Sequence, residues 1–99
     1  MAIGEIVRFP EGAGAPEFDA VQAEMDLGSN PQDGLIVHCA GEVEGRFQVF
    51  GIWESADHLD RFEEERLRPA MKTVMGEEQY AALPDAERVR NEVHNYVIP

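Results

Sequence analysis

The fold of this chain is decided by the stretch LIVHCAGEVEGRFQVFGIW, which occupies residues 35–53. Its first part, residues 35–40, is apolar enough for a strand that is covered on both faces. The polar residues and the glycine at 42–45 indicate a turn, and residues 46–53 read as a second strand. The stretch therefore predicts a β-hairpin, and the segments around it must supply the layer that covers it.

A helix is expected before the hairpin. Pro16 suits the first turn of a helix, where a missing backbone N–H has no cost. Phe18, Val21 and Met25 recur at spacings of three and four residues, which places them on one apolar stripe. Gly28 is a natural residue for the end of this helix.

A second helix is expected after the hairpin. Ser55 can cap its first turn, and Leu59 and Phe62 supply an apolar stripe. Pro69 is expected to kink or end the helix, because a proline inside a helix removes a hydrogen bond and clashes with the preceding turn. Residues 69–75 can then form a further short helix.

Strands are also expected at the two ends of the chain, over residues 3–9 and 93–98. The resulting order is β-α-β-β-α-β with a short extra helix. This order is typical of the ferredoxin-like α+β fold, in which a four-stranded antiparallel sheet carries its helices on one face. Ninety-nine residues are enough for one domain only, so residues 1–99 are expected to form a single unit.

Composition limits the partners of this domain. Twenty acidic and eight basic residues give a formal charge of −12, which repels nucleic acid and anionic lipid surfaces. No segment approaches the roughly 20 apolar residues of a membrane span, and the first residues lack the basic region of a signal peptide. One cysteine cannot form an internal disulfide, so we expect a cytoplasmic protein in a reducing compartment.

The ferredoxin-like arrangement leaves one face of the sheet without helices. The predicted strands nevertheless carry apolar side chains on both faces, and monomers rarely expose apolar patches of more than a few hundred Å². A second copy of the same sheet, packed face to face about a two-fold axis, is the simplest cover. We therefore expect a homodimer with a ligand cavity between its sheets.

Two stretches resemble a known family, namely GRFQVFGIWES at residues 45–55 and FEEERLRPA at residues 62–70. A strand that ends in Trp-Glu-Ser, followed by a helix with Phe-x-x-x-x-Leu-x-Pro, is similar to the dimeric α+β barrel superfamily. Within it, the match is to small proteins related to the antibiotic-biosynthesis monooxygenase (ABM) domain. The resemblance implies a homodimer with a cavity between helices and sheet or within the barrel. In some members it implies oxidation of aromatic substrates without metal or flavin.

The resemblance also points to individual positions. Trp53 matches the aromatic residue that typical ABM members place at the end of this strand, near the cavity. Those members commonly have an acidic residue two positions earlier and a histidine nine positions later. Gly51 and Phe62 occupy these positions here, so two polar groups of the usual site are replaced.

His38 is a titratable side chain inside an otherwise apolar strand. If Glu42 pairs with Gly45 across a two-residue turn, His38 lies opposite Val49. A three-residue turn would instead place His38 with Gln48 and Phe50. We favour the first register, because it groups four apolar residues as a core that faces the helices: Leu35, Val37, Phe50 and Ile52. On the other face it groups His38 with Ile36, Phe47 and Trp53.

A candidate site follows from this register. His38 would be the catalytic residue, because burial lowers the pKa of a histidine and leaves a neutral imidazole that can act as a base. The expected wall around the ligand consists of Ile36, Phe47, Val49 and Trp53. The alternative is a structural histidine whose ring is hydrogen-bonded to a neighbour in the core.

His94 and Tyr96 are polar insertions in the last predicted strand. Dimerisation in this superfamily brings the fourth strand near the partner's second strand, so either side chain could complete a composite site around His38. Alternatively, both lie at a solvated edge, where polar side chains discourage aggregation.

The sequence thus predicts a small homodimeric protein that binds a hydrophobic or aromatic ligand, with a cofactor-independent monooxygenase as the catalytic version. A non-catalytic ligand-binding or interaction module on the same fold is the alternative. The histidines at 38, 58 and 94 form no close-spaced ligand pair, and no glycine-rich dinucleotide motif occurs. We therefore expect neither a metal nor a cofactor.

Overall fold

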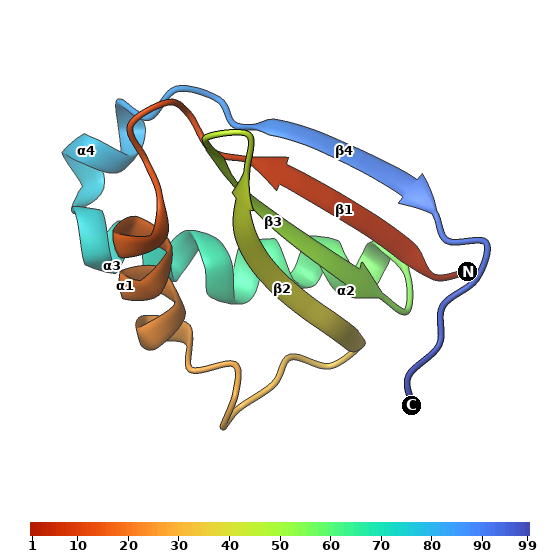
Figure 1. Cartoon of the computed structure of the whole chain (residues 1–99). Coiled ribbons are helices and arrows are strands. Elements are labelled where there is room, and N and C mark those ends of the chain that lie inside the picture. Colours follow the sequence, from red (N-terminus) through yellow and green to blue (C-terminus); the bar gives the residue numbers. More distant parts are fainter.

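The computed structural model describes residues 1–99 and places four strands in one antiparallel sheet of order β2-β3-β1-β4 (Figure 1). The strands are β1 (Ile3–Arg8), β2 (Leu35–Val43), β3 (Arg46–Trp53) and β4 (Glu87–Glu92). Helices α1 (Ala15–Met25) and α2 (Ala56–Phe62) follow β1 and β3. A π-helical turn, η1 (Glu63–Leu67), and the helices α3 (Arg68–Met75) and α4 (Glu77–Ala81) complete the order. The predicted ferredoxin-like α+β fold is confirmed, with the second and fourth strands at opposite edges.

The hairpin has a two-residue turn, but at a different place from the predicted one. Val43 pairs with Arg46, and the turn residues Glu44 and Gly45 both have positive φ, 51° and 81°. Such a turn favours glycine at its second position, because only glycine adopts this conformation without strain. Every pair from Val37 to Val43 is therefore shifted by two residues from the prediction, and His38 lies opposite Gly51 rather than Val49.

A shift of two residues keeps the predicted grouping of side chains from Val37 onward, but the helices cover the other group. Leu35 is the exception, because the bulge before Val37 leaves it packed against the helix-side core, as predicted. Trp53 is 1% exposed and packs in the core with Leu59 and Phe62 of α2. The face with His38 and Trp53 is thus the one that the helices cover, whereas Phe50 lies on the other side, which we call the outer face. Alternation along a strand separates two faces, but it does not say which one the helices choose.

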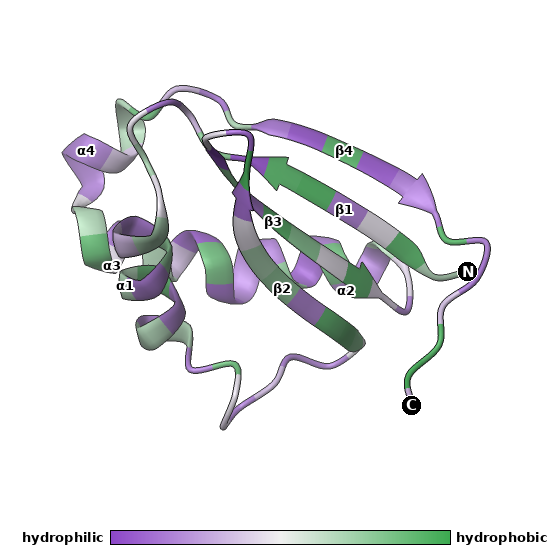
Figure 2. Ribbon diagram, in the orientation of Figure 1, coloured by the Kyte–Doolittle hydropathy of each residue, from purple (hydrophilic) through white to green (hydrophobic).

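The last strand was also placed wrongly. It spans Glu87–Glu92 rather than residues 93–98, which continue beyond the sheet without strand structure. Four of its six residues are charged, and Figure 2 shows it as the most hydrophilic strand of the sheet. Arg88 and Arg90 form ion pairs with Glu5 and Glu63. This strand is therefore held by salt bridges and its β-ladder, neither of which produces an apolar pattern.

The helices begin much as expected and end differently. The Ser55 hydroxyl accepts a hydrogen bond from the backbone N–H of His58, as an N-cap does. α1 ends at Met25 rather than near Gly28, because Asp26 adopts the left-handed conformation. Pro69 does not end the second helix. The chain stays helical from 56 to 75, and the π-helical turn η1 lies just before the proline, where it accommodates a residue without a backbone donor.

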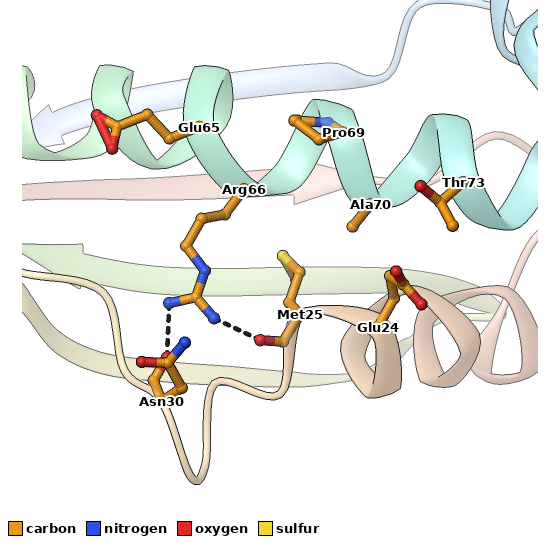
Figure 3. A pocket seen from close by; sticks show the side chains of 8 residues that line it. All are labelled: Glu24, Met25, Asn30, Glu65, Arg66, Pro69, Ala70 and Thr73. Carbon is orange, nitrogen blue, oxygen red and sulfur yellow. Dashed lines mark hydrogen bonds between the residues drawn. The ribbon is translucent and has the colours of Figure 1, made fainter.

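The carboxyl end of α1 is held by an arginine from the opposite helical segment. Arg66 of η1 donates hydrogen bonds to the carbonyl oxygens of Met25 and Asn30, the latter at 2.6 Å (Figure 3). The last turn of α1 contains no basic residue of its own. The guanidinium therefore supplies both the donors and the positive charge that a helix end favours.

We expect Arg66→Ala to lower the free energy of unfolding by about 1–3 kcal/mol, because two carbonyl groups lose a charged donor. Chemical denaturation measures this loss. Arg61→Ala is the matched control, since Arg61 is about half exposed and only 3.9 Å from its partner Asp33, and it should change stability by less than about 1 kcal/mol. Equal losses in both variants would contradict the role of Arg66.

Candidate functional site

A cavity of about 900 Å³ lies between the helix-covered face of the sheet and the helices α1, α3 and α4. Such a volume is within the range of small-molecule binding sites. Most of its lining is apolar, including Phe18 of α1, Phe62 of α2 and Met71 of α3. Polar side chains reach the wall at a few places, among them Glu5, Gln22 and His38. The amide oxygen of Gln22 is buried and has no hydrogen-bond partner.

His38 lies on the wall of this cavity between two aromatic rings. Its imidazole stacks on Phe18 with ring centroids 6.3 Å apart and meets the edge of Phe62 at 6.4 Å. Neither ring nitrogen forms a hydrogen bond within the protein. Burial lowers the pKa of His38 below its ordinary value, because the charged form is poorly solvated there. The ring is thus neutral at physiological pH, with an acceptor nitrogen available to a ligand.

Gly51 lies beside this histidine, and its lack of a side chain makes room for two neighbouring rings. A Cβ at residue 51 would lie 3.0 Å from Nε1 of Trp53 and 3.5 Å from the His38 ring. The indole and the imidazole therefore occupy the space that the side chain of any larger residue at position 51 would need. On the other side of Gly51, Glu5 of β1 is its direct partner in the sheet. One row across three strands consequently carries a carboxylate, a glycine against which the Trp53 indole lies, and an imidazole, all on the helix-covered face.

Glu5 belongs to a cluster of ion pairs, of which Glu5, Glu63 and Arg88 line the cavity. Its Oε2 is 2.9 Å from Nε of Arg90, and its Oε1 is 3.4 Å from Nη1 of Arg88. The same two arginines contact Glu63 at 3.1 and 3.3 Å, and Arg90 also contacts Asp60 at 2.9 Å. Burial raises the pKa of Glu5, and the nearby Glu63 adds to this effect, although the hydrogen bond from Arg90 opposes it.

The cavity includes only part of the candidate set from the sequence. His38, Val49 and Trp53 line it. Phe47 does not line the cavity. Its ring packs against those of Phe9 and Phe18, with centroids 5.2 and 5.4 Å apart. Ile36 is not on the wall, because a β-bulge between Leu35 and Val37 removes it from the regular pairing.

His94 and Tyr96 are exposed in the segment after β4 and do not line the cavity. The His38 ring lies on the helix-covered face, against Phe18 of α1 and Phe62 of α2. Within one copy of the chain neither residue shares the cavity with His38, and a composite site across two copies stays a prediction.

Sequence reasoning missed Glu5, although one signal was available. Glu5 interrupts the apolar alternation of the first strand, on the same side as Ile3 and Val7. Its partners could not be identified, because Arg88 and Arg90 lie more than eighty residues away in a segment that has no apolar pattern. No group of three or more His, Cys, Asp or Glu side chains is arranged to hold a metal ion. None of the helices combines the length and the apolar content needed to cross a bilayer.

Comparison with known proteins identifies the fold. No protein-family model matches the sequence, and no curated protein matches it significantly. Solved structures do match over nearly the whole chain. SnoaB from Streptomyces nogalater, described as a cofactor-independent oxygenase, has a TM-score of 0.65 at 16% identity, covering 97% of this chain and 96% of its own. Rv0793 from Mycobacterium tuberculosis has a TM-score of 0.69 at 16% identity, covering 99% of this chain and 100% of its own.

A third match is a Deinococcus radiodurans protein, provisionally described as an antibiotic biosynthesis monooxygenase. It has a TM-score of 0.63 at 12% identity, covering 100% of this chain and 98% of its own. At such identities the likeness establishes the fold alone. The chain therefore has the ABM-like fold, as its sequence stretches at 45–55 and 62–70 suggested.

Proposed function

We propose that this protein binds a small aromatic molecule in the cavity between its helices and sheet and oxidises it with dioxygen, without a cofactor. The observation that carries the proposal is the neutral His38 ring, which has no hydrogen-bond partner in the protein and lies on an otherwise largely apolar wall. A free acceptor nitrogen beside aromatic side chains fits an aromatic substrate with an acidic C–H group. The fold shared with SnoaB supports the same reaction class.

The proposed reaction converts a CH₂ group of the substrate into a carbonyl group. His38 accepts a proton from this carbon, and the resulting carbanion transfers an electron to dioxygen. Recombination of the two radicals forms the C–O bond of a peroxide. Loss of the second hydrogen as a proton and cleavage of the O–O bond then give the ketone and one molecule of water. One dioxygen is consumed for each substrate, and its four-electron reduction balances the oxidation of the carbon.

Anthrone is a suitable probe, because its methylene group is acidic and lies between aromatic rings. Protein that has been treated with EDTA and shown to contain no flavin should accelerate anthrone-dependent oxygen uptake and form one anthraquinone for each dioxygen. An oxygen electrode and absorption spectra measure the two quantities. Oxygen uptake at only the spontaneous rate would contradict the enzymatic part of the proposal.

A non-catalytic ligand-binding module is the second candidate function. It is favoured by Gly51 and Phe62, which occupy the positions where typical members of the ABM family have an acidic residue and a histidine. Such a protein should bind aromatic probes in the same cavity, yet leave the rate of oxygen uptake unchanged.

We further propose that the protein is a homodimer that buries the outer face. Four apolar side chains cross all four strands of this face in one row, Val89, Ile6, Phe50 and Cys39. Ile6 and Val89 are 37% and 62% exposed, and a second copy of the row would cover them. Sedimentation equilibrium should give twice the chain mass of 11.1 kDa, and Ile6→Glu should dissociate the dimer. A species of 11.1 kDa at micromolar concentration would contradict this proposal.

A further inference from the structure

Glu5 is an unusual wall residue, because it places a carboxylate in a largely apolar cavity. Its side chain is only 7% exposed. It lies on the helix-covered face of β1, with Gly51 of β3 on one side and Arg90 of β4 on the other. Gly51 has no side chain of its own on the β3 side of the carboxylate, and the Trp53 indole lies against this glycine. His38 follows beyond Gly51 in the same row.

The charges around Glu5 do not balance. Glu63 from η1 and Asp60 from α2 approach from the helices, whereas Arg88 and Arg90 approach from β4. Across Gly51, His38 is neutral. The cluster thus contains three carboxylates and only two guanidinium groups. Glu5 and Glu63 are buried and each contacts both arginines, whereas Asp60 is 59% exposed and contacts Arg90 alone.

Burial of the Glu5 carboxylate has a cost in stability, since a charged group loses its hydration there. The two arginines offset this cost only in part, because the pKa of Glu5 remains raised. Perturbed acids of this kind concentrate at functional sites. The two arginines orient the Glu5 carboxylate, while its position on the cavity wall leaves it accessible to a bound molecule. An ionised carboxylate only accepts hydrogen bonds. The group that it would recognise is therefore a donor on the ligand.

We propose that Glu5 is a substrate-anchoring residue, which accepts a hydrogen bond from a hydroxyl group on the aromatic ligand. The inference rests on the proposed function and narrows the ligand to hydroxylated aromatic molecules. Glu5 and His38 are two strands apart, or about 10 Å between backbones, a span that two or three fused rings can bridge. The hydroxyl-bearing edge of the ligand thus faces Glu5, and the opposite edge faces His38.

Naphthalene and 2-naphthol test this assignment, because they differ only in the hydroxyl group. The chain contains a single tryptophan, so the one indole N–H resonance of Trp53 reports binding of either probe by NMR. At pH 7.5 we expect 2-naphthol to bind about tenfold more tightly than naphthalene, as for a hydrogen bond to a charged acceptor. As the pH falls through the raised pKa of Glu5 and the carboxylate is protonated, this preference should shrink. The affinity for naphthalene should change little.

Two variants separate Glu5 from the rest of its cluster. Glu5→Gln keeps the shape but removes the charge, so the preference for 2-naphthol should fall to about twofold and lose its pH dependence. Asp60→Asn is the matched control. It removes a carboxylate of the same cluster whose side chain is 59% exposed and does not line the cavity. This variant should keep the tenfold preference.

A second measurement needs no variant. The ¹³C resonance of the Glu5 carboxyl group follows its titration in the unmodified protein. Saturating 2-naphthol should lower the midpoint by about one pH unit, because a tenfold preference for the ionised form corresponds to that shift. Naphthalene should leave the midpoint in place.

The outcomes are distinct for the two proposals. If both probes bind equally at every pH, or if 2-naphthol does not move the Glu5 midpoint, the role of Glu5 is overturned and the ligand cavity stands. If neither probe perturbs Trp53, both the anchoring role and the proposed ligand site are overturned.

Discussion

Replacing His38 with alanine is expected to lower kcat/KM for anthrone oxidation by about 100-fold or more, the usual contribution of a general base. The imidazole is the titratable group that the aromatic side chains Phe18 and Phe62 hold against the cavity. Alanine removes the acceptor nitrogen and leaves the rest of the wall in place. Oxygen uptake at saturating and limiting anthrone separates kcat from KM.

His94→Ala is the matched control for this prediction. His94 is exposed in the segment after β4 and does not line the cavity, so its removal should leave the rate unchanged. The unfolding transition of each variant shows that it is folded. If His38→Ala changes only the affinity for anthrone, the protein is a ligand-binding module. If it changes neither rate nor affinity, His38 has a structural role.

The pH dependence of turnover gives an independent check on His38. The base is active when the ring is neutral, and burial lowers its pKa below the ordinary 6.5. The rate should therefore be constant through neutral pH and fall only on the acid side, with a midpoint below 6.5.

Truncation of Trp53 should have the largest effect on stability. Trp53 is 1% exposed, and its ring lies 4.7 Å from that of Phe62. Trp53→Ala is expected to lower the free energy of unfolding by about 3–5 kcal/mol, through lost apolar burial and a cavity that neighbours cannot fill. That is a large share of the roughly 5–15 kcal/mol that stabilises a domain. Urea denaturation measures it.

This variant also tests which face of the sheet the helices cover. If Trp53 lay on the outer face, its removal would weaken self-association more than folding. Tyr96→Ala is a suitable control, because Tyr96 is 45% exposed and its loss should cost less than about 1 kcal/mol. Similar values for both variants would contradict the packing described for Trp53.

The sequence predicted the architecture because apolar periodicity and turn residues are local signals. The two central strands, the Ser55 cap and the alternation that groups His38 with Trp53 all follow from residues within a few positions of one another. The choice of face depends instead on which stripe of a distant helix fits which side of the sheet. Leu59 and Phe62 pack against the side of the sheet that carries Trp53, and no short-range pattern in the sequence indicates this choice.

The candidate site was predictable only in part, for a related reason. His38 was found because a titratable residue is conspicuous in an apolar strand. Glu5 was equally conspicuous, but its importance depends on arginines contributed by the far end of the chain. β4 was misplaced because salt bridges hold it in the sheet, and charged residues at its exposed positions resemble those of a loop.

The two edge strands determine how this sheet can associate. β4 presents a rim on which four of six residues are charged, and β2 is bent by a β-bulge between Leu35 and Val37. Charged rims and bulges both prevent a further strand from extending a sheet sideways. The addition of further strands, as in fibril growth, is therefore blocked at both edges of the sheet. This holds even though one copy of the domain carries a row of apolar side chains on its outer face.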